Sequence, residues 1–538
     1  MSKKLIALLL ALVLCVGMLA ACGGNGNETT KGNDSTTGTG DATADGYVAP
    51  NLNGKKITIY TSNNKDYDLE DSYLNKLVEK HLNADLEIIE IQGSEVEQLL
   101  LQRKAPDMQF STGFAYSMFD LVIDGAYINI YDYLDQMPNV KAWIEKPENA
   151  MHVSKYLSGN GKILAAIPVV QIGGNAMKYA FLYRKDIFDK HNLTFPTNQE
   201  EFVAVLRQLK TLYPDSYPFM MGQMTGNMTG IRQLGHLWGG AHILGGLFGT
   251  YFTLNNDGEY YYGPVCQAYK EMAQFFVELE KEGLYNPSSW TASTTEWTAA
   301  FVGNASFIAY DRVDRLPTLN YNGQQLNPDF LMTAAAPFNF GTYAATATTV
   351  ATDYAGYATG YCWMIGNTDN LDNVLKYVDW LYSDEAYVMT NWGKEGESYV
   401  VNADGTKSFK EGFLESFGGN GLVVSGLWSA WQSGRTDFDA YLASCDENTR
   451  ASLELAGKYT EGGQLQKYVK YTQSEQDIYN AYGKAMYSYA LSEYAKFVTG
   501  QRDISEWDEV LKELKASFHY DELLAIHQSA LAALEKKQ

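Results

Sequence analysis

The strongest constraint on the fold is an alternation of strand and helix patterns near the start of the patterned chain. The residue types at 56–60, 86–91 and 106–111 indicate three short strands. Apolar residues at helical spacing separate them, at residues 73–82 and 96–101. This β-α-β-α-β order predicts a parallel sheet with helices on both faces, which binds ligands beyond the carboxyl ends of its strands.

Polar and aromatic side chains follow two of these predicted strands. Asn63 and Asn64 come after the first strand, and Phe114 and Tyr116 come after the third. Because parallel strands end at one edge of a sheet, we expect these four side chains to line a ligand site there.

A second patterned region begins near Lys178, and a chain of 538 residues is long enough for two or more lobes. Thr197 with Glu200 is typical of a capping box, and an apolar helical stripe follows it. A further helix is predicted at residues 269–279. The glycine-rich residues 222–249 indicate irregular structure, with a short helix near their middle.

The first residues of the chain predict where the protein is located. Lys3 and Lys4 precede an apolar run, which ends in Leu-Ala-Ala directly before Cys22. This arrangement resembles a bacterial lipoprotein signal, in which residues 1–21 are removed and Cys22 is lipidated. The alternative is an ordinary secretory signal in which Cys22 is incidental. Residues 22–50 are small and polar, so we expect a flexible tether and an extracytoplasmic protein anchored to the cell membrane by Cys22.

Charge and cysteine usage exclude several partners. The formal net charge is −23, with 41 basic and 64 acidic residues, which disfavours nucleic acid and anionic lipid headgroups. We therefore expect contact with the membrane through the lipid anchor only. Cys266, Cys362 and Cys445 are scattered and predict neither a disulfide framework nor a zinc site. No metal or cofactor is expected.

An ordered series of motifs covers most of the chain after residue 50. Its segments are Asn-Gly-Lys-Ile at 160–163, Ile-Pro at 167–168, Phe-Leu-Tyr-Arg-Lys-Asp-Ile-Phe at 181–188, Pro-Thr at 196–197, Glu-Glu-Phe at 200–202, Tyr-Pro at 213–214, residues 381–386, 391–393 and 395–399, Phe-Val-Thr-Gly at 497–500, Trp-Asp at 507–508, and Gln-Ser-Ala at 528–530. The series thins at residues 312–359 and 405–470. In this order, it is similar to the extracellular solute-binding lipoproteins (family 1) of bacterial ABC importers for sugars and oligosaccharides.

The resemblance implies an α/β, two-lobe periplasmic-binding-protein-like fold of type II, with lobes joined by a multi-segment hinge. We expect the chain to cross between lobes near residues 170–178, 302–305 and 358–361. The expected N-terminal lobe comprises residues 55–170 and 305–358, and the C-terminal lobe comprises residues 171–304 and 359–538.

The resemblance also implies the activity. We expect a monomeric binding protein, not an enzyme, which captures a neutral oligosaccharide in the cleft between the lobes and delivers it to ABC permease subunits. The alternatives are a secreted carbohydrate-active enzyme and a sugar-sensing receptor of the same fold. The chain has no His-Glu-x-x-His, no Gly-x-Ser-x-Gly and no phosphate-loop motif.

Aromatic side chains are the candidate sugar platforms, because a pyranose presents apolar C–H faces and a rim of hydroxyl groups. Most of the 10 tryptophans are expected to fill lobe cores, and Trp380 and Trp507 are assigned there. The tryptophans near predicted crossings or in irregular segments are better candidates: Trp238, Trp363, Trp392 and Trp428.

Polar groups near the predicted crossings are the candidate hydroxyl partners. Tyr310, Asp311 and Arg312 follow an apolar strand, and the charged pair is either a hydroxyl clamp or a surface salt bridge. Gln171 lies on the first predicted crossing and is expected to face the cleft.

Overall fold

The predicted β-α-β-α-β segment opens a five-stranded sheet in the computed structural model. Strand β1 (Lys55–Ser62) pairs in parallel with β2 (Ala84–Ile91) and with β3 (Met108–Ser111). Helix α2 (Tyr73–Leu82) connects β1 to β2. The Ser72 hydroxyl caps it by accepting a hydrogen bond from the third helical residue. The three predicted strands and the first predicted helix are thus confirmed.

The residues that the structure describes are 47–62, 68–91, 105–111, 117–158, 160–171, 178–222, 234–238, 252–254, 260–262, 265–342, 361–418, 421–429, 432–459 and 471–535. The helix expected at residues 96–101 lies outside them. Residues Ala49–Gln538 form one compact unit. No helix in the described part of the chain has the length and apolar character that a membrane span requires.

Two later strands complete the first sheet in the order β2-β1-β3-β11-β4. Strand β11 (Cys362–Ile365) runs antiparallel to β3 and to β4 (Ile167–Pro168). The buried Asp379 carboxylate accepts hydrogen bonds from the backbone N–H groups of Asn139 and Val140, at 2.7 and 3.1 Å. It therefore caps one helix from another that is distant in sequence.

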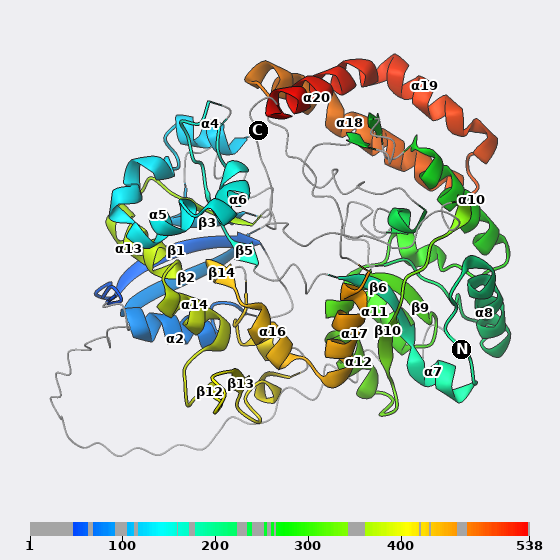
Figure 1. Ribbon diagram of the computed structural model, residues 1–538, viewed down its shortest axis with the longest axis horizontal. Helices are drawn as coiled ribbons and strands as arrows, with labels where there is room; N and C mark the ends of the chain where they lie inside the picture. Colours follow the sequence, from blue (N-terminus) through cyan, green and yellow to red (C-terminus); the bar gives the residue numbers. More distant parts are fainter. Residues whose placement is uncertain are drawn as a thin grey trace, which may run out of the picture. The chain divides into compact units, whose positions relative to one another are not determined.

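Helices and small strand pairs surround this first sheet, and together they form the first lobe (Figure 1). The helices are α4 (Ser117–Ile123), α5 (Pro138–Ile144), α6 (Ala150–Ser154), α13 (Leu371–Leu381), α14 (Asp384–Trp392), α15 (Gly421–Val424) and α16 (Phe438–Ser444). The pairs are β5 (Val170–Gln171) with β14 (Arg435–Thr436), and β12 (Tyr399–Val401) with β13 (Lys407–Phe409).

The second lobe is built on a three-stranded antiparallel sheet in the order β10-β6-β9. Its strands are β6 (Tyr179–Arg184), β9 (Ile308–Arg312) and β10 (Met332–Ala335). Helix α17 (Glu447–Gly457) covers the outer edge of β10, where the Ser452 hydroxyl accepts a hydrogen bond from a backbone N–H of the strand at 3.2 Å. This edge strand is therefore not open to pairing with another chain.

Helices pack their apolar faces around the second sheet and enclose a core rich in aromatic rings. The predicted capping box of Thr197 with Glu200 is wrong. Asn198 is the N-cap of α8 (Gln199–Leu212), while Thr197 donates to Glu201. The other helices are α7 (Lys185–Lys190), α10 (Gln267–Lys281), α11 (Thr294–Val302), α12 (Leu316–Gln324), α18 (Gln473–Val498), α19 (Trp507–Ser517) and α20 (Tyr520–Glu535).

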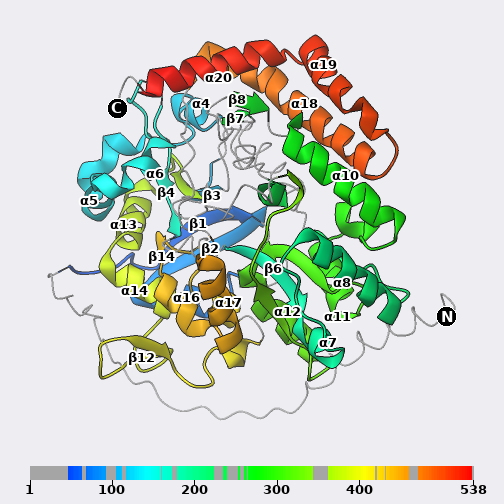
Figure 2. The same ribbon diagram turned by 45° about the vertical axis from the view of Figure 1, so that its right-hand side comes forward.

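The last three helices belong to the second lobe. Helix α18 packs on α10, and α19 and α20 pack on α18, as the orange and red ribbons show in Figures 1 and 2. Strands β7 (Phe252–Leu254) and β8 (Tyr260–Tyr262) pair as a short antiparallel hairpin, and its turn lies outside the described residues.

Strand pairing corrects the expected division into lobes. Strand β9, at residues 308–312, pairs with β6 of the second sheet, whereas the expected division placed it in the first lobe. Strand β11, at residues 362–365, pairs with β3 of the first sheet, whereas it was expected in the second lobe. Hydrogen bonds between distant strands decide these assignments, and short motifs along the chain do not encode them.

In the order of its described elements, the chain passes three times from the lobe of one sheet to the lobe of the other. It crosses between β5 and β6, as expected, and again between β10 and β11. The third passage is the two-residue joint Cys445–Asp446, where Cys445 ends α16 and the Asp446 side chain caps α17. No passage occurs at residues 302–305, because α11 and β9 both belong to the second lobe.

Candidate functional site

A cluster of charged and aromatic side chains lies where elements of the two lobes meet. From the second lobe, Arg312 ends strand β9, and Asp314 follows in a short 3-10 helix. Arg312 Nε and Asp314 Oδ1 lie 3.0 Å apart, and the two side chains are 31% and 18% exposed. The Asp314 carboxylate raises the pKa of Arg312, so this guanidinium is always charged.

The first lobe contributes two aromatic side chains to this cluster. Tyr441 lies on α16, and burial raises its pKa well above 10, with the nearby Asp314 carboxylate adding to the shift. Tyr441 therefore stays protonated at neutral pH and presents a phenol close to the charges of the second lobe. Trp428 stacks on Tyr441 with ring centroids 4.7 Å apart and planes at 25°.

Trp428 has an unusual backbone conformation. Its φ is 55°, in the left-handed region that bulky side chains rarely adopt, and its backbone N–H donates to the Thr390 carbonyl at 2.9 Å. Such backbone conformations cost about 1–3 kcal/mol and are concentrated at ligand sites. The surrounding structure thus holds this partly buried indole in one orientation against Tyr441.

Four buried polar atoms of the cluster have no hydrogen-bond partner among the described residues. They are Trp428 Nε1, Tyr441 Oη, Arg312 Nε and Asp314 Oδ1, and the last two form an ion pair without hydrogen-bond geometry. Each unsatisfied buried polar atom costs about 1–3 kcal/mol. Donors and acceptors in this state suit a polar ligand that carries several hydroxyl groups.

The structure separates the residues of the hydroxyl clamp predicted at 310–312. Arg312 belongs to the cluster, but Asp311 is 3% exposed and pairs with Arg315 at 3.0 Å. Tyr310 is fully buried, and its ring packs 6.1 Å from that of Tyr179 inside the second lobe. The carboxylate that accompanies Arg312 is Asp314, which sequence reasoning missed because it lies past the end of the strand.

Three of the four predicted tryptophan platforms are core residues in this structure. Trp238, Trp363 and Trp392 are 4%, 1% and 2% exposed, so none presents a ring face to a ligand. The Trp363 indole donates to the Ser433 carbonyl at 3.0 Å, and the Trp392 indole donates to Asp437 at 2.8 Å. The expectation that Trp380 and Trp507 fill the core is confirmed.

Trp428 is the predicted platform that lies in the cluster. Asn63, Asn64, Phe114 and Tyr116 lie outside the described residues. Gln171 is the last residue of β5 and pairs through its backbone with Thr436.

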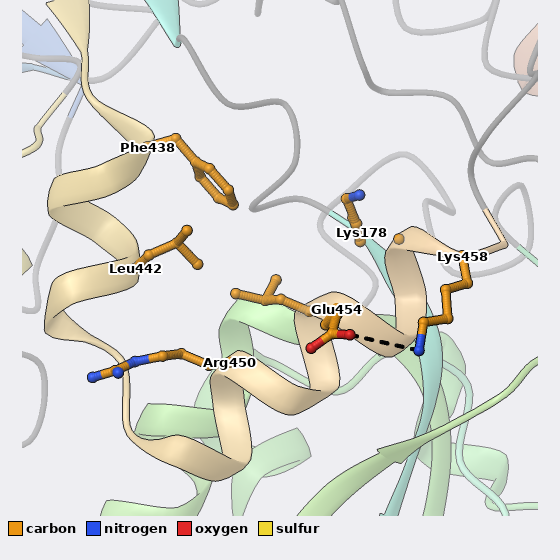
Figure 3. A pocket seen from close by; sticks show the side chains of 8 residues that line it. Lys178, Phe438, Leu442, Arg450, Glu454 and Lys458 are labelled. Atoms are coloured by element: carbon orange, nitrogen blue, oxygen red, sulfur yellow. Dashed lines mark ion pairs between the residues drawn. The ribbon is translucent and has the colours of Figure 1, made fainter.

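A pocket of 530 Å³ adjoins the cluster (Figure 3). Phe438 connects the two, because its ring lies 6.1 Å from that of Tyr441 and also lines the pocket. The lining residues come from α16, α17 and the residue before β6: Lys178, Phe438, Leu442, Arg450, Leu453, Glu454, Gly457 and Lys458. Its volume lies within the range of small-molecule sites.

Sequence reasoning missed this pocket entirely. Most of its residues fall within 405–470, where the series of motifs is thinnest, and no single one has a conspicuous sequence context. Within the described part of the chain, no cluster of three His, Cys, Asp or Glu side chains is suited to hold a metal ion.

The family of the chain follows from comparison with known proteins. The family model described as "Bacterial extracellular solute-binding protein" matches residues 65–388, which is more than half of the chain. The chain therefore belongs to the bacterial extracellular solute-binding proteins.

Particular relatives are distant but cover most of the chain. Lipoprotein LipO of Bacillus subtilis (strain 168) is 21% identical over 428 residues, which is 76% of this chain and 77% of LipO. The alginate-binding protein AlgQ2, solved without calcium ion, is 21% identical with a TM-score of 0.71, over 88% of this chain and 97% of AlgQ2.

A third similar protein is the ABC-transporter substrate-binding protein FusA of S. pneumoniae, an EF-hand mutant in complex with fructo-nystose. It is 17% identical with a TM-score of 0.69, over 90% of this chain and 100% of that structure. These similarities confirm the two-lobe α/β fold of the periplasmic-binding-protein type.

Proposed function

We propose that this protein is the solute-binding component of an ABC importer and captures a neutral oligosaccharide between its lobes. The observation that carries the proposal is the cluster in which Trp428 and Tyr441 of the first lobe meet Arg312 and Asp314 of the second. A ligand held by both pairs favours one arrangement of the lobes, and the permease recognises that arrangement.

The chemistry of the cluster supports a neutral sugar. Arg312 donates and Asp314 accepts, so a sugar with neighbouring hydroxyl groups satisfies both, while their charges balance. The aromatic rings supply apolar contact for C–H faces. The net charge of −23 disfavours an anionic ligand at long range. Two similar proteins are described as alginate-binding and as bound to fructo-nystose, which supports a carbohydrate.

The membrane anchor is part of the same proposal. Cys22 is the lipidated N-terminus that keeps the protein outside the cytoplasm and close to its permease. The similarity to a protein described as a lipoprotein supports this anchor, together with the sequence before Cys22. Mass spectrometry of the native protein tests it: an unmodified N-terminus at another residue would contradict the assignment.

Binding by the native protein tests the ligand class. We expect an array of neutral glycans to retain the protein, and its bound member to raise the unfolding temperature. Trp428→Ala should lower the affinity for that glycan by about 2 kcal/mol, as for a residue at the centre of an interface. Trp428→Phe should keep part of this affinity, because the aromatic ring still stacks on the glycan while the indole N–H donor is lost.

The matched control is Trp297→Phe, at a buried tryptophan whose indole donates to the Met221 carbonyl within the second lobe. We expect this variant to change stability and leave affinity as it is. The proposed ligand class would be contradicted if peptides or acidic glycans retained the protein and no neutral glycan did.

A further inference from the structure

Strand β2 is the longest outer strand in the two main sheets of the described chain. It spans eight residues at one end of the first sheet, between β1 and helix α2 in Figure 1. The other outer strands of these sheets, β4, β9 and β10, have two to five residues. A long outer strand is a template for pairing with another chain unless its free backbone groups are occupied.

The residues of β2 favour pairing with a second copy of the same strand. Its sequence contains Ile88, Ile89 and Ile91, which are partly buried and belong to the β-branched type that strands prefer. Pairing with β1 runs in parallel over all eight residues and uses one side of β2. An antiparallel copy of β2 has the same length, and the two-fold symmetry of such a pair satisfies both strands equally.

Two carboxylates occupy the outer side of β2, and we call Glu70 and Glu79 the edge carboxylates. Glu79 lies on α2, and its Oε1 accepts a hydrogen bond from the Leu86 backbone N–H at 2.9 Å. Glu70 lies in the turn before α2, and its Oε2 accepts a hydrogen bond from the Ile88 backbone N–H. Backbone groups alternate in direction along a strand, so these two N–H groups point to the same side, away from β1. Neither donor is therefore available to another chain.

A buried asparagine holds this arrangement in place. Asn75 on α2 is 2% exposed, and its Nδ2 donates to the Leu86 carbonyl at 3.4 Å and to the Glu70 carbonyl at 2.9 Å. The first bond occupies an outward acceptor of β2, and the second fixes the turn that carries Glu70. Leu86 thus has both of its outward backbone groups bonded within the chain.

The charge along this edge is predominantly negative. Partial burial raises the pKa of Glu70, against the hydrogen bond from Ile88, and the neighbouring carboxylates of Glu79 and Glu87 raise this pKa further. Lys56 Nζ lies 3.0 Å from Glu87 Oε1 and balances that carboxylate. Two copies that met at β2 would bring both sets of edge carboxylates together, and like charges on facing strands repel each other.

We propose that the edge carboxylates keep this protein from pairing with a second copy of itself through β2. When both are removed, the partner that β2 takes is β2 of another molecule, in an antiparallel pair that joins the two first sheets. The edge carboxylates act in two ways, by bonding the outward N–H groups and by repelling an identical edge. This inference concerns self-association and does not depend on the ligand.

Sedimentation velocity at pH 7 tests the proposal on the full chain, with Cys22→Ser in every variant so that no lipid contributes to association. We expect one chain per particle with the native edge, and two chains per particle when Glu70→Ala and Glu79→Ala are combined. Glu70→Ala alone changes an exposed side chain and should give a smaller shift in the same direction. Adding Ile88→Pro to the double variant should restore the monomer, because proline removes an outward N–H and is tolerated at a sheet edge.

The matched control combines Asp71→Ala with Glu87→Ala. It removes two charges from the same surface, where these side chains pair with Lys76 and Lys56, and it leaves both outward N–H groups bonded. We expect this control to remain monomeric. The proposal would be overturned by self-association of the native edge, or by equal association of the control and the double variant. A folded double variant that stays monomeric at the same concentration, or a dimer that persists with Ile88→Pro, would also overturn it.

Discussion

Two arginine–aspartate pairs of the second lobe share one sequence pattern but have opposite surroundings. Arg184 ends strand β6 and Arg312 ends strand β9, and each is followed by an aspartate two residues later, Asp186 and Asp314. Because β6 and β9 are antiparallel, the two pairs lie at opposite ends of the sheet. One end is interior to the second lobe, and the other faces the first.

The Arg184 pair is a closed structural unit. Arg184 is 1% exposed and donates two hydrogen bonds to Asp186, at 2.8 and 2.7 Å. It also donates to the Phe301 carbonyl and to Asn304 Oδ1, and its guanidinium lies 4.1 Å above the Phe330 ring. Every part of this guanidinium has a partner, so it holds strand, helix and turn together.

The Arg312 pair differs, because the guanidinium donors of Arg312 lack hydrogen-bond partners among the described residues. Arg312 makes no side-chain hydrogen bond to any described residue, and its contact with Asp314 at 3.0 Å lacks hydrogen-bond geometry. Each nitrogen of Arg184 has a hydrogen-bond partner, whereas Arg312 Nε has, within the described chain, only its ion pair with Asp314. A partly exposed guanidinium with unused donors at a lobe boundary is suited to bind a ligand, and a buried one whose donors are all used is suited to hold the fold together.

The largest expected effect is on stability at the closed pair. Arg184→Met should lower the free energy of unfolding by about 3–5 kcal/mol, because it leaves Asp186 and a buried carbonyl without a partner. Arg312→Met should cost about 1 kcal/mol or less, since that side chain is partly exposed. Urea denaturation of both variants measures the difference. Similar losses of unfolding free energy in both variants would show that the two pairs have the same structural role.

A smaller effect, on binding alone, is expected at the open pair. Arg312→Gln should weaken the binding of the neutral glycan about tenfold, because a charged donor to the hydroxyl groups of the glycan is lost. Calorimetry of this variant should show the loss with an almost unchanged unfolding midpoint. If Arg312→Gln binds the glycan as tightly as the native protein, or loses stability together with affinity, the Arg312 pair is structural like the Arg184 pair.

The smallest effect concerns alkaline pH and the phenol beside the open pair. Burial and Asp314 raise the pKa of Tyr441 in the folded protein, so the unfolded chain ionises first, near pH 10. The stability that Tyr441 contributes is therefore present below pH 10 and lost as the pH rises above it. Above pH 10, we expect the free energy of unfolding of Tyr441→Phe to fall by about 1 kcal/mol less per pH unit than that of the native protein. Denaturation at pH 9 to 11 tests this, with the exposed Tyr131→Phe as control, and parallel curves for native protein and Tyr441→Phe would contradict it.

The local elements of this protein were determined by its sequence alone. Periodic apolar residues specified α2, α8 and α10, and strand patterns specified β1, β2 and β3, because each signal lies within a few neighbouring residues. The ordered motifs likewise indicated the family, because each is a short run of neighbouring residues. One motif, at residues 181–188, contains the Arg184 pair and is structural in origin.

Tertiary structure alone decided the division into lobes and the site. Strand β9 joins the second sheet and β11 the first through pairing with strands more than 100 residues away, which no local pattern records. Trp363 and Trp428 were both predicted from the sequence to be sugar platforms, yet Trp363 is buried in a core and Trp428 lies at the lobe boundary. Binding residues are assembled from both lobes, and burial and hydrogen-bond partners depend on contacts that exist only after the chain has folded.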